Sequence, residues 1–312
     1  MQEESYLGHQ IERTSIEVRY DEAVKRLLAN KLILATIMQG CVEEYRNCTV
    51  QEIAEQYIED EPQIGTVGVN PDDTNAARDK NIHGSNTEDA TLTEGTVRYD
   101  IRFYAAAPAG DGRIGLIINL EAQKNEPTKY HILNRAIFYT ARLVSSQKER
   151  EFTGSDYNEI KQVYSIWICM NMRENSLSHI HMVKDDLLGD QDWKGNLDIP
   201  NIVMIGLAKE IPPKEERYEL HRLLGALLSQ TMTAEQKLEL MKQEYDIPVD
   251  RHSIREEVKI MCNLSEGVEE MGYAKGEAAG KAEGEKIGEA RGKAIGRSEG
   301  RLEGRLEGKS EE

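Results

Sequence analysis

The sequence is poor in cysteine and has no long apolar segment. It has four cysteines among 312 residues, and none of them forms a CxxC pair. This pattern predicts buried or inert thiols rather than a disulfide framework or a zinc site. The sequence has no run of 18 apolar residues, the length that a membrane-spanning helix requires. Residues 1–12 lack the apolar core of a signal peptide. We therefore expect a cytoplasmic protein with no membrane partner.

Basic residues are outnumbered by acidic ones, 39 Lys and Arg against 56 Asp and Glu, and no nucleotide-binding loop is present. The chain has a net charge of −17, which argues against binding nucleic acid over its whole surface. The segment from Tyr130 to Lys148 is an exception, because it contains basic residues and no acidic ones. If DNA binds, we expect it there. No GxxxxGK[ST] loop occurs, so nothing in the sequence supports nucleotide hydrolysis.

Apolar periodicity predicts an α/β domain over residues 16–210, preceded by a disordered N-terminus over residues 1–15. A period near 3.6 predicts helices, strict alternation predicts strands, and the apolar runs over residues 162–170 and 201–207 have the length of strands. A first helix over residues 20–38 should stop at Gly40. Thr49 and Glu52 have capping-box spacing, which predicts a second, short helix. The expected order is helix, strands, helix, strand, with the later elements over residues 96–104, 114–123, 130–146, 162–170 and 201–207.

The C-terminal part of the chain has a different pattern. Residues 211–266 predict a helical segment, with helices over 214–230, 233–245 and 250–263. Residues 267–312 form a tail with a glycine at every fourth position from 272 to 308. Each interior glycine costs a helix about 1 kcal/mol relative to alanine, so we expect a tail that is helical or disordered. The regular spacing would allow a second helix to approach closely, which predicts a homo-oligomer formed through this tail.

Three polar residues lie on one face of a predicted hairpin. Because side chains alternate along a strand, Asp100, Glu121 and Gln123 share a face in either of two registers. If the turn centres on Gly110 and Asp111, Asp100 faces Glu121 directly; one residue further, it faces Gln123. Two carboxylates at that distance repel each other unless a cation lies between them. Mg²⁺ prefers such oxygen ligands.

The alternative is a structural role for the same residues. Asp100 and Glu121 would then be surface residues on an open sheet face, paired with Arg98 and Arg102. The other face of the hairpin is apolar and carries two alternating sets of residues. These are Val97, Tyr99, Ile101 and Phe103 on the first strand, and Ile114, Leu116, Ile118 and Leu120 on the second.

A wider set of motifs favours the functional interpretation. Asp100 is followed by Glu121-Ala122-Gln123 and then by a helix with Arg135 and Tyr139. With the stretches TEGTVRYDIRF, INLEAQK, NRAIFYTARLVSSQ, VYSIWICMN and IMCNLSEG, this pattern resembles the PD-(D/E)XK nuclease superfamily. The closest group is the recombination-promoting nuclease, or transposase-like, family. The resemblance covers roughly residues 15–308.

The resemblance implies a fold, a cofactor and a reaction. The fold would be α/β, with a restriction-endonuclease-like αβββαβ core. Asp100 and Glu121 would bind Mg²⁺ or another divalent cation, and Gln123 would stand at the catalytic position that is lysine in most of the superfamily. The reaction would be hydrolysis of DNA phosphodiester bonds by an endodeoxyribonuclease linked to mobile elements or recombination. The alternative is a weak or inactive nuclease fold acting as a nucleic-acid-binding or regulatory oligomer.

The resemblance also implies residues that contact the substrate and a further acid. Arg135 and Tyr139 would contact the scissile phosphate or its flanks, because they lie one turn apart on a helix. Arg142, on the same helical face, is a weaker candidate. The further acid is left open among Glu22, Glu88 and Glu94.

Overall fold

The computed structural model describes residues 18–59, 61–65, 88–91, 95–109, 112–249, 254–264, 281, 283–289 and 291–293. The chain divides into two compact units. The larger spans residues 18–262, and the smaller combines residues 1–17 with 263–312. The predicted disordered N-terminus over residues 1–15 lies outside the described residues.

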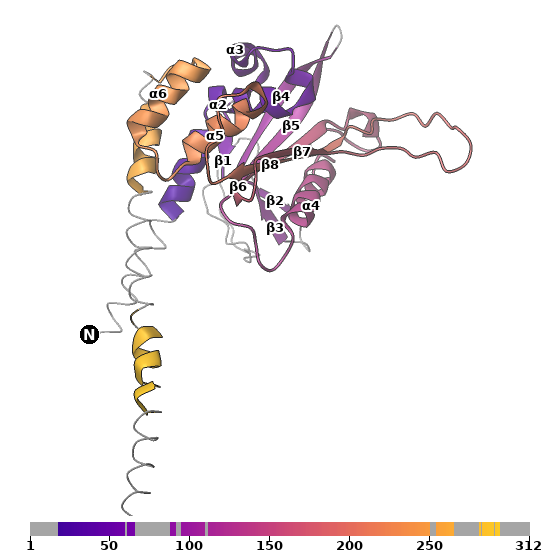
Figure 1. Cartoon of the computed structure of the whole chain (residues 1–312). Helices are drawn as coiled ribbons and strands as arrows, with labels where there is room; N and C mark the ends of the chain where they lie inside the picture. The colour runs from indigo at the N-terminus through magenta and orange to yellow at the C-terminus, as the bar shows by residue number, and fades with distance from the viewer. Residues whose placement is uncertain are drawn as a thin grey trace, which may run out of the picture. The chain divides into compact units, whose positions relative to one another are not determined.

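The larger unit is built on a six-stranded sheet in the order β1-β4-β5-β6-β8-β7 (Figure 1). The two central pairings, β5 with β6 and β6 with β8, are parallel, and the other three are antiparallel. The strand bounds are Gln63–Ile64 (β1), Ile101–Ala109 (β4), Gly112–Gln123 (β5), Gln162–Met172 (β6), Ser176–Ile180 (β7) and Pro200–Ala208 (β8). A mixed sheet with flanking helices confirms the α/β class.

The predicted strand over residues 96–104 is broken in the structure. Its first part is β3 (Gly95–Arg98), which pairs with β2 (Glu88–Thr91) in a separate two-stranded sheet. Its second part is β4, so Tyr99 and Asp100 lie between two sheets. The prediction that Tyr99 shares a face with Ile101 is wrong, because the break interrupts the alternation. Tyr99 is buried in the cluster formed with α4.

The predicted helix over residues 20–38 is two helices, over residues 18–28 and α2 (Lys31–Cys41). The side chain of Asn30 caps α2 by accepting a hydrogen bond from the main-chain N–H of Leu32. Gly40 does not stop the helix as predicted. A Cβ there would lie 3.0 Å from Leu220 Cδ2, so glycine lets α2 pack closely against α5 (Glu219–Leu228).

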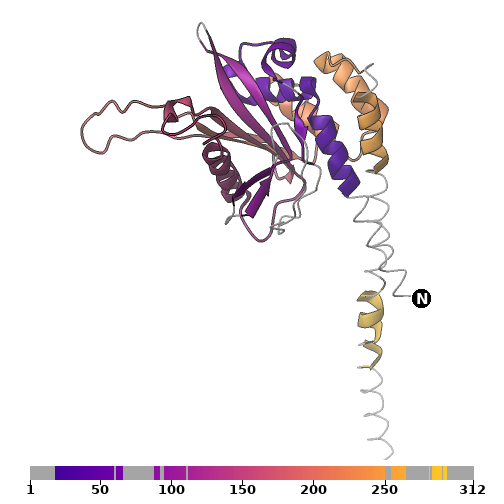
Figure 2. The same ribbon diagram turned by 180° about the vertical axis from the view of Figure 1, so that it is seen from behind.

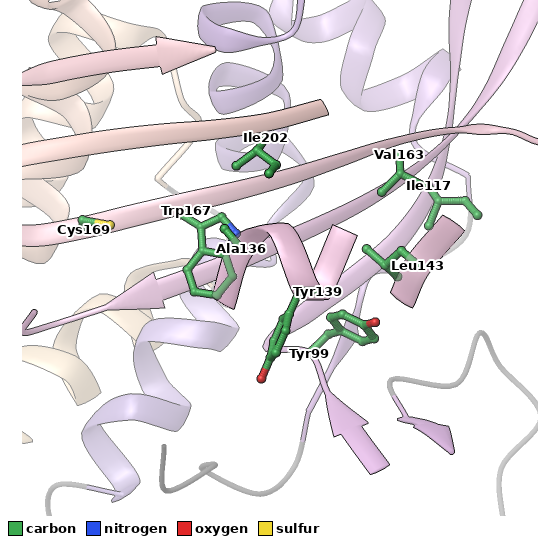
Figure 3. Close-up of a cluster of buried hydrophobic side chains, with 9 residues drawn as sticks. All are labelled: Tyr99, Ile117, Ala136, Tyr139, Leu143, Val163, Trp167, Cys169 and Ile202. Atoms are coloured by element: carbon green, nitrogen blue, oxygen red, sulfur yellow. The ribbon is translucent and has the colours of Figure 1, made fainter. Parts of the chain in front are cut away.

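Helices cover both faces of the sheet, as Figures 1 and 2 show. Helix α4 (Ile132–Ser145) packs against β6 and β8. The helix over residues 18–28, α2 and α5 lie on the opposite side of the sheet. Under α4, the buried cluster of Figure 3 consists of Tyr99, Ile117, Ala136, Tyr139, Leu143, Val163, Trp167, Cys169 and Ile202.

The remaining helices follow the predicted order. Thr49 forms the predicted capping box with Glu52 at the start of α3, and Thr233 forms another with Gln236 at the start of α6. The bounds are Glu43–Tyr45 (η1), Val50–Glu52 (α3), Ile53–Tyr57 (η2), Tyr157–Glu159 (η3), Glu216–Tyr218 (η4) and Ala234–Tyr245 (α6), followed by a helix over residues 254–264.

The described parts of the smaller unit are helical. They are residues 263–264, at the end of the helix over residues 254–264, and residues 281, 283–289 and 291–293 of the glycine-repeat tail. The rest of that tail lies outside the described residues. Gly284, Gly288 and Gly292 have open space where a Cβ would stand. Over the described part of the chain, no helix combines the length and the apolar character needed to cross a membrane.

Candidate functional site

The register of the β4–β5 hairpin places Asp100 beside Glu121. Ala109 pairs with Gly112, and Ile101 pairs with Leu120. These pairings are those of the first of the two registers considered above. Asp100 precedes Ile101 and Glu121 follows Leu120, so the same register places Asp100 opposite Glu121.

Asp100 and Glu121 are joined directly by hydrogen bonds. The main-chain N–H of Asp100 donates to Glu121 Oε1 at 3.1 Å. In return, the main-chain N–H of Ala122 donates to Asp100 Oδ2 at 3.2 Å. The Glu121 side chain is 3% exposed and that of Asp100 is 15% exposed. The structure therefore brings together the two acids that the sequence predicts as metal ligands.

Lys25 is a further member of the site, and the sequence analysis missed it. Its Nζ lies 2.8 Å from Asp100 Oδ1 and 2.7 Å from Asp21 Oδ2. Burial alone would lower the pKa of Lys25, but the charges of Asp100 and Asp21 outweigh it and raise that pKa. One signal could have found Lys25: it is a lysine on the buried face of its helix, four residues after Asp21.

Arg135 reaches Glu121 from α4. Its Nη2 lies 3.8 Å from Glu121 Oε2 and donates a hydrogen bond to Tyr139 Oη at 3.0 Å, while its Nη1 donates to Tyr130 Oη at 3.1 Å. The guanidinium also lies over the rings of Tyr139 and Trp167. Figure 3 shows these two rings side by side under α4. Two tyrosines and two aromatic faces therefore hold Arg135 toward the acids.

The pKa values of Glu121 and Tyr139 reflect burial and neighbouring charge. Burial raises the pKa of Glu121 well above its usual range, and the charge of Asp100 raises it further, against the opposing effects of Arg135 and Lys25. Burial and the charge of Glu121 raise the pKa of Tyr139 to about 12. Tyr139 therefore keeps its proton near neutral pH.

Gln123 lies on β5 two residues after Glu121, but its amide is engaged elsewhere. Its Nε2 donates to the carbonyl oxygen of Asn125 at 2.9 Å. Arg142, two turns beyond Arg135 on α4, is buried. Asn119 is buried on the same face as Glu121 and donates to Ser165 Oγ at 3.3 Å, and its side-chain oxygen has no hydrogen-bond partner among the described residues.

The acid that would complete the site is not settled among the three predicted candidates. Glu22 is half-buried beside Asp21 in the helix over residues 18–28. Glu88 begins β2, but its side chain lies outside the described residues, as does Glu94 altogether. Through Lys25, the structure brings Asp21 to the site instead.

The charge balance of the site leaves room for a cation. With every group ionised, Asp21, Asp100 and Glu121 carry three negative charges against two positive charges on Lys25 and Arg135. With Glu121 ionised, as a bound metal would keep it, the surplus is one negative charge. A magnesium ion fits this donor set, because hard cations bind carboxylate oxygens. Within the part of the chain that the structure describes, no three His, Cys, Asp or Glu side chains gather closely enough to hold a metal, so water or substrate would supply the remaining ligands.

Comparisons with known proteins identify no relative. No family model matches the chain, and no curated protein or solved structure matches it. The resemblance to the PD-(D/E)XK nucleases therefore rests on the motif, and membership of that superfamily stays a prediction.

Proposed function

We propose that the protein is a magnesium-dependent endonuclease that hydrolyses phosphodiester bonds in DNA. The observation that carries this proposal is the direct pairing of Asp100 with Glu121 at the end of a hairpin, beside the buried Lys25 and the half-buried Arg135. The element order supports it: helices, β1, the β4–β5 hairpin, α4, and β6 parallel to β5 are compatible with an αβββαβ core. The link to mobile elements or recombination is a prediction from the resemblance alone.

Asp100 and Glu121 would hold the divalent cation, which polarises the phosphate and lowers the pKa of a bound water when present. A divalent cation would change the surplus charge of the site from −1 to +1. A phosphodiester group carries one negative charge, so substrate would bring the cluster to neutrality. This balance favours binding of metal and substrate together over binding of either alone.

Lys25 and Arg135 would replace the lysine that is absent at position 123. Lys25 is bonded to Asp100, so it can orient that carboxylate or meet a phosphate oxygen next to it. Arg135 is held by Tyr130 and Tyr139. Its planar guanidinium can donate two parallel hydrogen bonds to two oxygens of one phosphate. Gln123 brings no charge and would act, at most, as a hydrogen-bond donor or acceptor for water.

A cavity offers a place for the flanking part of the substrate. It has a volume of about 190 Å³ and contains Tyr20, the residue before Asp21, and Lys124, the residue after Gln123. It lies at the carboxyl ends of β5, β6 and β8, the edge at which parallel sheets commonly bind ligands. Lys209 also lines it. The two lysines at this cavity would bind a phosphate that neighbours the scissile one on the same DNA strand.

A second candidate is a catalytically weak or inactive nucleic-acid-binding protein. The observation that favours it is the burial of Glu121, together with the occupation of Asp100 by Lys25. If Lys25 stays paired with Asp100, it would exclude the metal from that carboxylate. The two candidates differ in metal binding, which isothermal titration with Mn²⁺ measures directly.

The deciding experiment incubates the purified chain with plasmid DNA, single-stranded DNA or RNA, in Mg²⁺ or in EDTA. We expect cleavage of DNA in Mg²⁺ alone, and a loss of about a thousandfold or more in rate for Asp100→Asn or Glu121→Gln. The matched controls are Asp156→Asn and Glu159→Gln, which change exposed acids and should keep the wild-type rate. Equal rates in all five proteins would refute the site. DNA binding without cleavage, and without Mn²⁺ binding, would favour the second candidate.

A further inference from the structure

A long apolar arm leaves the sheet between β7 and β8. Here the arm means residues 181–199, which connect Ile180 at the end of β7 to Pro200 at the start of β8. Figures 1 and 2 show this segment extending beyond the strands that carry it. The described hydrogen bonds within it are few and local, such as that from Trp193 N–H to the carbonyl oxygen of Gln191. Loops of this length without secondary structure are uncommon in compact domains and are usually either functional or linker segments.

The arm presents its largest apolar side chains to solvent. Leu187 is 96% exposed, Leu188 98% and Trp193 77%. Three more are exposed along the same segment: Met182, Val183 and Leu197. Single exposed apolar residues are normal, but a group of this size marks an interaction site.

The charge of the arm excludes some classes of partner. It contains five aspartates against Lys184 and Lys194, and so has a net charge of −3. Both lysines are already paired with aspartates of the arm itself. Nucleic acid and anionic lipid surfaces would both be repelled. The partner that fits is an apolar protein surface with positive charge at its rim.

The same chain carries such a surface on α4. Leu133, Ile137 and Phe138 are exposed there, Phe138 to 55%. Their spacing of four and five residues places them on one side of the helix. The other exposed residues of α4 are uncharged: Asn134, Ala141 and Ser145. We call this the α4 face. It is distinct from the side of α4 that carries Arg135 and Tyr139 toward the sheet.

Positive charge borders the α4 face. Lys129 lies just before α4, and Lys148 and Arg150 follow it; all three are exposed. Glu149 is the one acid among residues 129–131 and 146–150, and Glu126 and Glu151 lie just beyond these two stretches. An acidic apolar arm and an uncharged apolar face with a basic border are therefore complementary, and both belong to the same polypeptide.

We infer that a second copy of this chain is the partner, with the arm of each protomer docked on the α4 face of the other. Such an exchange is reciprocal under twofold symmetry, so each contact is made twice. Stable interfaces bury about 1,200 Å² or more in total, and two arms of this length supply exposed apolar area at both contacts. This assembly does not use the glycine-repeat tail, and it does not depend on nuclease activity.

The first test is the mass of the full-length chain by light scattering over a concentration series. We expect wild type at twice the chain mass of 35.3 kDa. Leu187→Asp/Leu188→Asp in the arm, and Ile137→Lys/Phe138→Lys in the α4 face, should each raise the dissociation constant about a hundredfold or more. The matched control for the arm variant is Ser155→Asp/Asn158→Asp, which adds the same two negative charges at exposed positions elsewhere, and that for the face variant is Ser155→Lys/Asn158→Lys. Both controls should leave the dimer intact.

A mixing experiment separates arm-to-face docking from other arrangements. Each chain of the arm variant keeps an intact α4 face, and each chain of the face variant keeps an intact arm. A mixed dimer can therefore form one complete contact. We expect a heterodimer weaker than wild type but stronger than either variant alone. A face variant that dimerises like wild type would show arm-to-arm contact and overturn the inference.

Two further outcomes would also overturn the inference. A wild-type monomer at all concentrations excludes a second copy, whether or not the arm folds back on its own chain. Wild-type assembly that neither variant weakens would assign the interface to another surface, such as the tail. Acrylamide quenching of the Trp193 fluorescence reports whether the arm is buried. The Trp193 signal is obtained by subtracting the fluorescence of the Trp193→Phe variant, and its quenching must fall as the dimer forms.

Discussion

Lys25 Nζ lies 2.8 Å from Asp100 Oδ1 and joins the helix over residues 18–28 to the start of β4. The lysine is also bonded to Asp21, so one buried cation is shared by two carboxylates. Charged lysines are rarely buried without such partners. The pairing therefore ties the first helix to the bend that presents Asp100 to Glu121.

Lys25→Met should lower the free energy of unfolding, because it leaves two carboxylates without their cation. We expect a loss of about 2 to 3 kcal/mol in the free energy of unfolding. This is less than the loss for a fully buried ion pair, because the Asp21 side chain is 40% exposed and solvent screens its charge. Urea unfolding measures this. The control is Lys31→Met, whose lysine is 3.9 Å from an exposed glutamate and should change stability by less than about 0.5 kcal/mol. Equal losses in the two variants would contradict the assigned role of Lys25.

The Glu121 carboxyl predicts a pH dependence of stability. Its pKa in the folded protein is raised above the ordinary value of 4.5, so the folded state keeps a proton that the unfolded chain has lost. The contribution is fully present below about 4.5 and is lost as the pH rises toward the folded pKa, by up to about 1.4 kcal/mol per pH unit. Denaturant unfolding in EDTA should show wild type weakening relative to Glu121→Gln as pH rises. A difference that is constant with pH would contradict this.

Gln123→Lys should preserve the fold and leave at least partial metal-dependent cleavage. Gln123 is only half-buried, and its one described hydrogen bond goes to the carbonyl oxygen of Asn125, which a lysine can also reach. We expect a change in stability below about 1 kcal/mol. Circular dichroism and the plasmid assay measure the two properties. A folded variant without any activity would show that Gln123 has a role that a lysine cannot fill.

Gly40→Ala should destabilise the protein although alanine favours helices. The gain in helix propensity is at most about 1 kcal/mol, whereas a Cβ would meet three atoms of the buried Leu220 side chain at 3.0 to 3.4 Å. Overpacking of this kind costs about 1 to 3 kcal/mol, so we expect a net loss near 1 kcal/mol by thermal unfolding. Gly288→Ala, which meets open space, is the control and should cause no loss. An equal response at both glycines would exclude the packing argument.

Local patterns determined much of what this molecule is. Apolar alternation predicted the strand β5, apolar runs of strand length predicted β6 and β8, and helical period predicted α4. Together they predicted the α/β class. The capping box at Thr49 was readable because it involves residues three apart. The shared face of Asp100 and Glu121 followed from the period of two along a strand. These features depend on interactions within a few residues, which a sequence displays directly.

Other features were decided only by tertiary structure. The choice between two hairpin registers depended on how β4 and β5 pack into the whole sheet. Lys25 became part of the site because folding brought a distant helix beside Asp100, and burial of a charge is favourable only where partners are assembled around it. Gly40 continues α2 rather than ending it because Leu220 of α5 lies against it. Each of these depends on contacts between residues far apart in the chain, which local periodicity does not encode.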